Sequence, residues 1–476
     1  MSISDKLTEL GYSPIAEDFY RMIDLWENWY QGDVKSFHSY SVFNGQSRVR
    51  CKRYTLGMAK KVAEDWANLL MNEKVSVTLE GKDEQEFVDG VLSANNFDVK
   101  INEMQELKSA LGTVAYIPRI NNVLVDSSTG RILSGANARI ALDYVTAKNI
   151  HPLSWDNGIV TECAFSSLRI VQNSRGNKGT KYIYLQIHTL ENGKYVIRNH
   201  LYEFNNGSLG NAVSLADVRG FENIPSEVNT SSDTRQFVID RLNIANNVDY
   251  TLPFGVPAYA NAIDILKGSD IAYDSYVNEF VLGKKRIMVK PAASKNMDGE
   301  PYFDAQDLVY YVLPEDMQDG DIIKEIDMTL RTEEHARGVQ DQLNLLSSKC
   351  GFGEGHYQFN SGSVQTATQI ISENSTLFRT LKKHEIILED VLKELCRIIL
   401  RLGNSVIGLS LDENVEISID FDDSIIEDEE TDFNRDMRKL AAGIINPYEF
   451  RMKWENEDEA TARAALPDMV SLMGGD

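Results

Sequence analysis

QTATQIISENSTLFRTLKKHEIILEDVLKELCRIILRLG, residues 365–403, is the stretch that decides the fold. Its spacing predicts one uninterrupted helix from Gln365 to Gly403, of about ten turns and roughly 58 Å. Leucines recur every seventh residue, and other apolar residues widen the same stripe: Leu381, Leu388, Leu395, Leu402, Phe378, Val391, Leu392, Ile398 and Ile399. A stripe of this length needs a partner along it, which indicates an extended subunit or an assembly.

Composition limits the class of protein. Of 476 residues, 42% are hydrophobic and 25% charged, which is typical of a folded chain with a sizeable core and about two to four domains. The net charge of −24 makes the chain as a whole repel nucleic acid and acidic membranes. Any contact with DNA must therefore be local or non-adhesive.

The cysteines and the N-terminus add two expectations. Cys51, Cys163, Cys350 and Cys396 are far apart and lack metal-ligand spacing, so we expect buried thiols in a reducing cell. The first residues lack the pattern of a signal peptide, and no apolar run is long enough to span a membrane. We expect neither secretion by signal peptide nor membrane insertion.

The first half of the chain changes from helical to β-rich character. Helices are predicted over Ala16–Tyr30, Leu56–Asn72, Asp83–Ser93 and Val99–Leu111, with a strand over Val75–Leu79. The aromatic face of the first helix suits a core or a subunit interface better than a base-stacking platform. Strands follow between Thr113 and Phe237: Val114–Ile120, Val123–Val125, Ile140–Val145, Ile159–Ile170, and the hairpin Tyr182–Leu190 with Tyr195–Phe204. His188 and His200 in the hairpin predict cross-strand polar pairs and not a metal site.

A local basic segment stands out in this acidic chain. No acidic residue interrupts it between Asp33 and Glu64. It contains Lys35, Arg48, Arg50, Lys52, Arg53, Lys60 and Lys61. Three readings stay open: a contact with DNA, a contact with an acidic neighbouring subunit, or a solvated loop.

The second half alternates helix, β insert and helix. A helix is predicted over Asn261–Leu282, ended by Gly283, and another over Leu330–Lys349. Between them, Lys284–Met328 contains three short strand patterns: Arg286–Val289, Leu308–Leu313 and Ile322–Ile326. A glycine-rich loop, Phe352–Val364, leads into the long helix.

Familiar catalytic motifs are missing, but one densely acidic run is a candidate metal site. The chain has no phosphate-binding loop, nucleophile elbow or zinc-protease motif. Residues 412–432 are densely acidic, and Asp420, Asp422 and Asp423 end the predicted strand Val415–Phe421. These carboxylates would suit a divalent ion in a metal-dependent nucleic-acid enzyme, although a solvated acidic rim is the plainer interpretation.

The order helix, β insert, helix, glycine-rich loop and very long helix resembles the portal proteins of tailed bacteriophages, the head-to-tail connectors. Local strings fit this family too: WENWYQG at 26–32, ANLLMNE at 67–73, residues 264–283 before KKRIMV at 284–289, and TATQIISENS at 366–375. The resemblance implies an α+β subunit that forms a ring, typically of twelve copies, around a DNA channel. Another capsid-shell protein that assembles through the same helix is the remaining structural alternative.

The resemblance also implies a division of the chain. It assigns an N-terminal region and wing to 1–260 (β-rich at 113–237), stem helices to 261–283 and 329–350, a clip to 284–328, a tunnel loop to 351–365, a long helix and wing return strand to 366–431, and a crown to 432–476. The DNA-facing loop would present Lys349, Gly353, Gly355, His356, Gln358, Asn360, Ser361, Gly362, Ser363 and Gln365. The clip would dock its partners through Lys284, Lys285, Arg286 and Lys290.

The partners follow from the same resemblance. They are other copies of the chain, double-stranded DNA, the terminase large subunit, a head-completion adaptor, and the major capsid and scaffolding proteins. The protein would reside in the virion after assembly in the host cytoplasm, and would act in genome packaging and ejection. No catalytic residue, metal or cofactor is implied.

Overall fold

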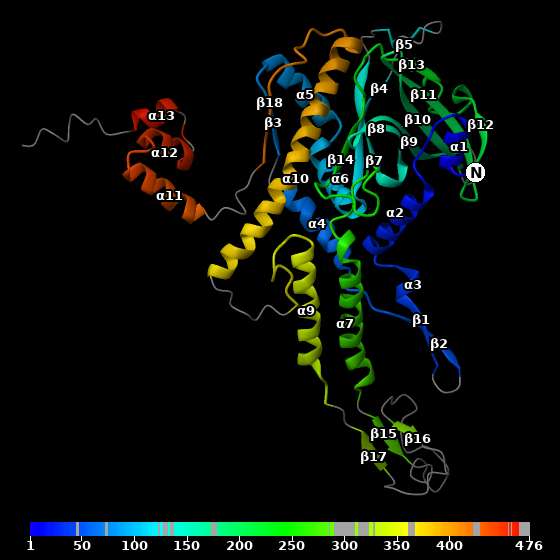
Figure 1. The fold of residues 1–476 in the computed structure, drawn as a ribbon, viewed down its shortest axis with the longest axis vertical. Coiled ribbons are helices and arrows are strands. Elements are labelled where there is room, and N and C mark those ends of the chain that lie inside the picture. The colour runs from blue at the N-terminus through cyan, green and yellow to red at the C-terminus, as the bar shows by residue number, and fades with distance from the viewer. Residues whose placement is uncertain are drawn as a thin grey trace, which may run out of the picture. The chain divides into compact units, whose positions relative to one another are not determined.

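The computed structural model describes residues 1–43, 47–71, 75–121, 124–126, 132–133, 138–172, 179–284, 286–289, 310–312, 323–326, 329–359, 367–421, 429–455, 457 and 459–465 (Figure 1). Helices and strands are mixed along the chain, which confirms the predicted α+β class. Two compact units are present: residues 1–71 with 77–419, and residues 72–76 with 420–476.

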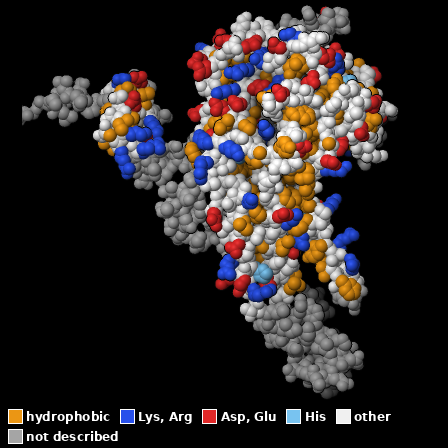
Figure 2. All heavy atoms as spheres, viewed as in Figure 1, with side chains coloured by type: hydrophobic (Ala, Val, Ile, Leu, Met, Phe, Trp, Pro, Cys, Tyr) orange, Lys and Arg blue, Asp and Glu red, His pale blue; other side chains and the backbone are white. Residues whose placement is uncertain are grey.

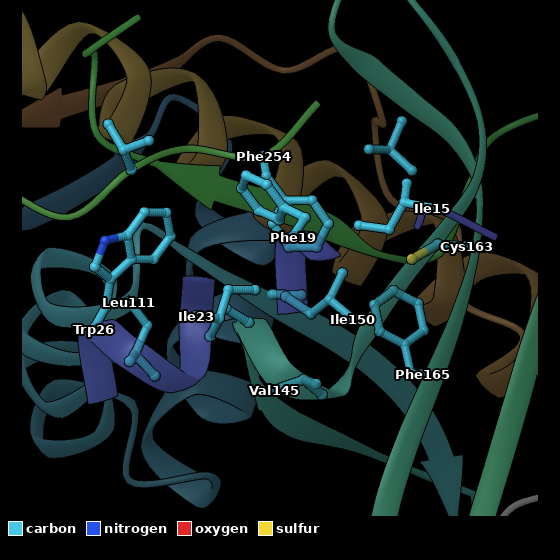
Figure 3. Close-up of a cluster of buried hydrophobic side chains, with 14 of the residues drawn as sticks. Ile15, Phe19, Ile23, Trp26, Leu111, Val145, Ile150, Cys163, Phe165 and Phe254 are labelled. Carbon is cyan, nitrogen blue, oxygen red and sulfur yellow. The ribbon is translucent and has the colours of Figure 1, made fainter. Parts of the chain in front are cut away.

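The N-terminal part of the chain contains the helices α1 (Ile3–Glu9), α2 (Glu17–Tyr30), α4 (Met58–Leu70), α5 (Lys82–Ala94) and α6 (Phe97–Leu111). Three of them, α2, α4 and α6, share one apolar core. All but α1 were expected from periodicity; α1 is a short helix closed by a capping box between Ser2 and Asp5. Phe19 and Trp26 of α2 are buried among residues from several strands, as Figure 3 shows for Val145, Ile150 and Phe165. The aromatic face of α2 therefore belongs to the core, as predicted.

Two antiparallel sheets build the β-rich part. The larger sheet has the order β12-β11-β10-β9-β8, with β13 also paired to β11, and the smaller has the order β14-β4-β7. Their bounds are β4 (Thr113–Asn121), β7 (Arg139–Thr146), β8 (Ile150–Asp156), β9 (Ile159–Val171), β10 (Thr180–Glu191), β11 (Lys194–Asn205), β12 (Ser208–Val213), β13 (Glu227–Asn229) and β14 (Val238–Arg241). The β10–β11 hairpin turns through Asn192 and Gly193, both with positive φ, as a two-residue turn of this kind requires. The expected strand near Val123–Val125 is β5 (Leu124–Val125), paired with β6 (Ile132–Leu133).

The prediction for the hairpin histidines was wrong. His188 lies opposite Ile197 on β11 and Cys163 on β9, and His200 lies opposite Leu185, so neither forms a cross-strand polar pair. The His188 ring meets Phe165 and Phe237 edge to face, at centroid distances of 5.6 Å and 5.4 Å. Burial lowers its pKa to about 3, and the same cause lowers the pKa values of His151 and His384 to about 3. These three rings are neutral at neutral pH.

The smaller sheet is tied to α6 by a buried charged network. Asp240 on β14 accepts hydrogen bonds from Lys108 (Nζ–Oδ1 3.0 Å), Gln105 (2.8 Å) and Tyr116 (3.3 Å). Burial lowers the pKa of Lys108, and the charge of Asp240 opposes that shift. A buried ion pair is tolerated when further hydrogen bonds satisfy its charged groups, and here Gln105 and Tyr116 both bond the Asp240 carboxylate.

The long helix was predicted almost in full. It is α10 (Ala367–Leu402), followed by one π-helical turn at Gly403–Ile407. The four leucines of the heptad stripe are at most 2% exposed. From Leu381 onward α10 packs on β14, β4, α4 and α5, and Glu394 forms a two-pronged ion pair with Arg235 (2.8 Å and 2.7 Å). The partner of the stripe is thus the chain's own body along this part of the helix.

Two further helices and a small sheet complete the first unit. Helices α7 (Ile263–Leu282) and α9 (Thr332–Lys349) lie side by side in Figure 1 and pack on each other. Strands β15 (Arg286–Val289), β16 (Tyr310–Val312) and β17 (Ile323–Ile326) form a sheet in the order β16-β15-β17, matching the three strand patterns of the sequence. Strand β18 (Ile417–Asp420) pairs with β3 (Ser76–Leu79).

The second unit is mainly helical in its described residues. It contains α11 (Glu429–Ala441), α12 (Pro447–Trp454) and α13 (Glu459–Ala464). Phe433, Phe450 and Trp454 form an aromatic cluster with centroid distances of 5.2–6.3 Å. Asp436 bonds Lys453 and Lys439, which lowers the pKa of its carboxyl to about 2.

The buried histidines predict a specific sensitivity to acid. Their folded pKa values lie below the ordinary value, so the unfolded chain binds more protons between about pH 6.5 and 3. Stability is therefore fully present above about pH 6.5 and falls as the pH drops, by at most about 1.4 kcal/mol per pH unit for each ring. Replacing His188→Phe should reduce the fall in melting temperature between pH 7 and pH 5, as measured by circular dichroism. An identical pH dependence in the variant and the parent chain would contradict this.

Candidate functional site

The glycine-rich loop after α9 is folded onto the body over its first half. Gly351, Gly353 and Gly355 all have φ near +90°, which a residue with a Cβ rarely adopts. A Cβ on Gly351 would also lie 2.8 Å from the Thr380 side chain of α10. These glycines therefore let the chain turn sharply between α9 and α10.

A stack of rings anchors this half of the loop. Phe352 stacks on Trp66 of α4 (4.7 Å, 29°) on one side and on His356 (4.5 Å, 12°) on the other. His356 Nε2 lies 3.7 Å from the carboxylate of Asp65, which Lys61 also bonds. Although burial would raise it, the nearby His356 and the hydrogen bond from Lys61 lower the pKa of Asp65. The imidazole is thus held between a ring and a carboxylate.

Backbone hydrogen bonds fix the next residues of the loop. Tyr357 N donates to Ser347 Oγ (3.2 Å), and Gln340 of α9 bonds both the Tyr357 carbonyl (2.8 Å) and the Phe359 N–H (2.7 Å). The Phe359 ring meets Tyr276 of α7 edge to face at 5.3 Å. The loop is therefore held to both α7 and α9 as far as Phe359.

The predicted DNA-facing residues divide into two sets. Lys349 and Gln358 are exposed, His356 is partly covered by the stack, Gly355 is half-buried and Gly353 is buried. The others lie outside the described residues: Asn360, Ser361, Gly362, Ser363 and Gln365. Their contact with DNA stays a prediction.

The predicted clip residues follow the end of α7. The backbone N–H of Gly283 donates to the Glu279 carbonyl (2.8 Å), which ends the helix at the expected residue. The Glu279 carboxylate bonds the Arg331 backbone N–H (3.1 Å) and guanidinium (3.0 Å) at the start of α9. Those bonds lower the pKa of Glu279 to about 2. Lys284 comes next, Arg286 begins β15, and Lys285 and Lys290 lie outside the described residues.

The basic segment of the sequence forms a structure that we call the arm, residues 34–57. It contains α3 (Lys35–His38) and a hairpin of β1 (Ser39–Phe43) and β2 (Arg48–Lys52). Its root is bonded to α7. Asp270, 4% exposed, accepts hydrogen bonds from His38 Nε2 (3.0 Å), the Leu56 N–H (2.7 Å) and Thr55 Oγ1 (3.2 Å). One turn further, Asp274 accepts from the Tyr54 N–H (2.9 Å).

Sequence reasoning missed this attachment. A signal existed in Asp270 and Asp274, two carboxylates four residues apart and therefore on one side of the helix. Buried carboxylates require hydrogen-bond donors, and the arm root supplies them. His38 Nδ1 accepts from the Val34 N–H (2.9 Å), so Nε2 carries the proton that it donates to Asp270.

The basic residues of the segment do not share one role. Lys52, Lys60 and Lys61 form ion pairs with Asp33, Glu106 and Asp65. The Arg53 guanidinium lies over the Phe37 and Tyr40 rings, at 4.3 Å and 5.0 Å. Within the part of the chain that the structure describes, Lys35, Arg48 and Arg50 have no ion-pair partner.

The remaining expectations concern metal binding, the cysteine thiols and membrane insertion. Among the described residues no group of three or more metal-ligating side chains occurs; Asp420 ends β18, and Asp422 and Asp423 lie outside those residues. Cys163, Cys350 and Cys396 are buried as expected, but Cys51 is half-buried on the arm, which corrects the expectation for that residue. No helix in the described ranges is both long and apolar enough to cross a membrane.

Comparison with known proteins identifies the family. The sequence profile described as "Phage portal protein, SPP1 Gp6-like" matches residues 12–463. The chain belongs to the phage portal protein family. Portal proteins are structural components of the phage capsid, so this portal protein is a part of the virion.

The other comparisons add little information about this portal protein. No curated protein matches the chain. A solved chain described as "Virion of native gene transfer agent (GTA) particle" is 10% identical, with a TM-score of 0.39, over 83% of this chain and 88% of that chain. That likeness is too remote to support any conclusion about fold or function.

The arm root offers a direct test. Asp270→Ala removes the acceptor for His38, Thr55 and Leu56, leaving buried donors without a partner at about 1–3 kcal/mol. Residues 34–57 should then exchange their amide hydrogens roughly tenfold faster or more, as measured by mass spectrometry. The matched control is Asp264→Ala, on the same helix with a 93% exposed side chain. Equal exchange of the arm in both variants would show that Asp270 does not hold it.

Proposed function

We propose that this portal protein assembles into a ring, typically of twelve copies, that surrounds the DNA channel at one capsid vertex. The observation that carries the proposal is the family match over residues 12–463. The paired helices α7 and α9, joined to α10 by the anchored loop, support the assignment of 261–283 and 329–350 as stem helices. Residues 1–260 and 366–431 would then form the wing, and 432–476 the crown.

The negative net charge of the chain suits a channel through which DNA passes without binding tightly. Each copy carries a net charge of −24, so a ring would repel phosphates along most of its surface. The tunnel loop, 351–365, would touch DNA through uncharged polar groups, which contact phosphate without strong attachment. We assign this contact chiefly to Gln358 and the residues after Phe359, because the earlier part of the loop packs on α4 and α9. Lys349, at the end of α9 and before the loop, provides an exposed positive charge.

The small sheet β15–β17 is the proposed clip. Lys284, Lys285, Arg286 and Lys290 gather at its first strand in the sequence, and we propose that they dock the terminase large subunit during packaging and a head-completion adaptor afterwards. The wing and crown would contact the major capsid and scaffolding proteins. The ring, the terminase and the adaptor would together carry out genome packaging and ejection.

Removing the later part of the loop tests the channel assignment. Deletion of residues 360–363 should leave rings intact in negative-stain images, because the anchoring contacts of Phe352 and Tyr357 are retained. Packaging or retention of DNA should fall at least tenfold in complementation assays. The comparison variant Phe352→Ala removes the ring stack and should reduce stability instead. Loss of rings on deletion of 360–363 would show that the segment is structural.

Charge reversal tests the clip. The triple variant Lys284→Glu, Lys285→Glu, Arg286→Glu should form rings but bind the terminase large subunit at least tenfold more weakly in pull-down or interferometry measurements. A matched control reverses three exposed charges elsewhere, at Arg21, Lys181 and Arg219. Unchanged binding in the clip variant would remove this assignment.

A further inference from the structure

Strand β10 of the larger sheet has two different sides. One side belongs to an apolar cluster that includes residues of α1, and it carries Ile183, Leu185 and Ile187. Tyr184, Gln186 and His188 alternate with these residues and therefore point to the other side of the sheet. There they line a cavity of about 510 Å³, a volume within the range of ligand-binding sites.

Both sheets and the segment that leads into β13 form the walls of this cavity. The first wall is the face of β10 and β11, the second is β4 at residues 118–121, and the third is the segment 220–228. Asn199 joins the first wall to the third, because it accepts from the Tyr184 hydroxyl (2.6 Å) and donates to the Pro225 carbonyl (2.7 Å). Apolar side chains make up much of the lining: Pro118, Ile120, Ile197, Phe221, Ile224 and Val228.

Two polar side chains inside the cavity lack partners. Gln186 is 9% exposed and His188 is 1% exposed. Neither ring nitrogen of His188 has a hydrogen-bond partner among the described residues, and the Gln186 amide has none there either. Buried polar groups are nearly always hydrogen-bonded, because leaving one unpaired is destabilising. Two such groups side by side in one cavity therefore indicate a ligand that bonds them.

The hydrogen-bonding capacity of these two side chains matches a peptide group. The neutral imidazole of His188 has one nitrogen that donates and one that accepts, and the Gln186 amide also does both. A peptide group likewise donates through its N–H and accepts through its carbonyl. The Phe165 and Phe237 rings pack edge to face on the His188 imidazole and fix its position.

One positive charge at the cavity is not neutralised. Two of the lining residues, Arg119 and Asp143, pair with each other at 2.8 Å. Arg169 also lines the cavity, is exposed, and has no ion-pair partner in the described parts of the chain. A single guanidinium forms a two-pronged pair with a carboxylate. Phosphate sites usually gather several cationic or helix N-terminal donors, and none of the described lining residues is a lysine. The ligand that fits carries a carboxylate.

The spacing of these groups sets the length of the ligand. Arg169 lies opposite Tyr182, which is four residues from Gln186, or about 13 Å along the strand. The arginine side chain covers part of that distance, and about two to three extended residues cover the rest. On the face of the body seen in Figure 2, Lys and Arg side chains lie among Asp and Glu side chains. Recognition of a carboxylate therefore depends on an individual residue such as Arg169.

We propose that this cavity binds two to three residues of an extended acidic peptide. Peptide groups of the ligand bond Gln186 and His188, and a carboxylate of the ligand pairs with Arg169. The walls come from a single subunit, so the site does not depend on the ring proposed above. It gives the β-rich body a binding role besides those of the channel and the clip.

A pair of matched peptides tests the ligand class. Ac-Gly-Glu-NH2 should bind the full chain saturably in saturation-transfer nuclear magnetic resonance titrations, with a dissociation constant on the order of 1 mM or lower. Ac-Gly-Gln-NH2 has the same shape without the charge and should bind at least tenfold more weakly. No saturable binding of the acidic peptide, or equal binding of the two peptides, would overturn the proposal. Tighter binding of AMP that is lost in Arg169→Gln would also overturn it, in favour of a nucleotide.

Substitutions test the place of binding. Arg169→Gln should weaken Ac-Gly-Glu-NH2 at least tenfold and abolish the difference between the two peptides. Gln186→Leu should weaken both peptides, because the bond to the peptide group is lost. The control Lys181→Gln removes an exposed positive charge from the other side of the same strand and should bind like the parent. Parental affinity of Arg169→Gln for the acidic peptide, with unchanged circular dichroism, would overturn the proposal. Because binding is measured on the single chain, this result would leave the portal ring standing.

Discussion

The carboxylate of Asp270 is the interaction on which the arrangement of arm and stem depends. It is nearly fully buried on α7 and accepts hydrogen bonds from His38, Thr55 and Leu56, which are separated from it by more than two hundred residues in the chain. A buried carboxylate without donors would be strongly destabilising, so the arm root and α7 stabilise each other. The position of the arm root on α7 is set at this point.

Paired charges also link elements elsewhere in the body. The buried Asp240 joins the small sheet to α6 through Lys108, and the partly buried Arg235, just before β14, is joined to α10 through Glu394. Between these polar links the contacts are apolar, led by the leucine stripe of α10 and the core around α2. The leucine-bearing face of α10 thus packs along the β-rich body.

Periodicity in the sequence predicted the elements with strong local patterns. Helices α7, α9 and α10, the β10–β11 hairpin and the three clip strands were all expected near their observed bounds. The short α1 and the strands β8 and β12–β14 were not, because their stability comes from pairing and packing more than from local pattern. The packing of the first half of the loop could not be predicted for a related reason. Trp66 and Phe352 are far apart in the sequence and come into contact only in the folded chain. His188 was misjudged because its strand neighbours are apolar, which a single strand does not reveal.

Glu279 contacts both chain segments that lead to the small sheet β15–β17. The Glu279 carbonyl holds Gly283 at the exit of α7, and the Glu279 side chain holds Arg331 at the entry of α9. The two ends of the clip segment are therefore fastened at a common anchor point. Because α7 and α9 also pack on each other, a force on the β15–β17 sheet would be passed to both helices together. In the proposed ring, a load on that sheet would accordingly reach the body through the helix pair.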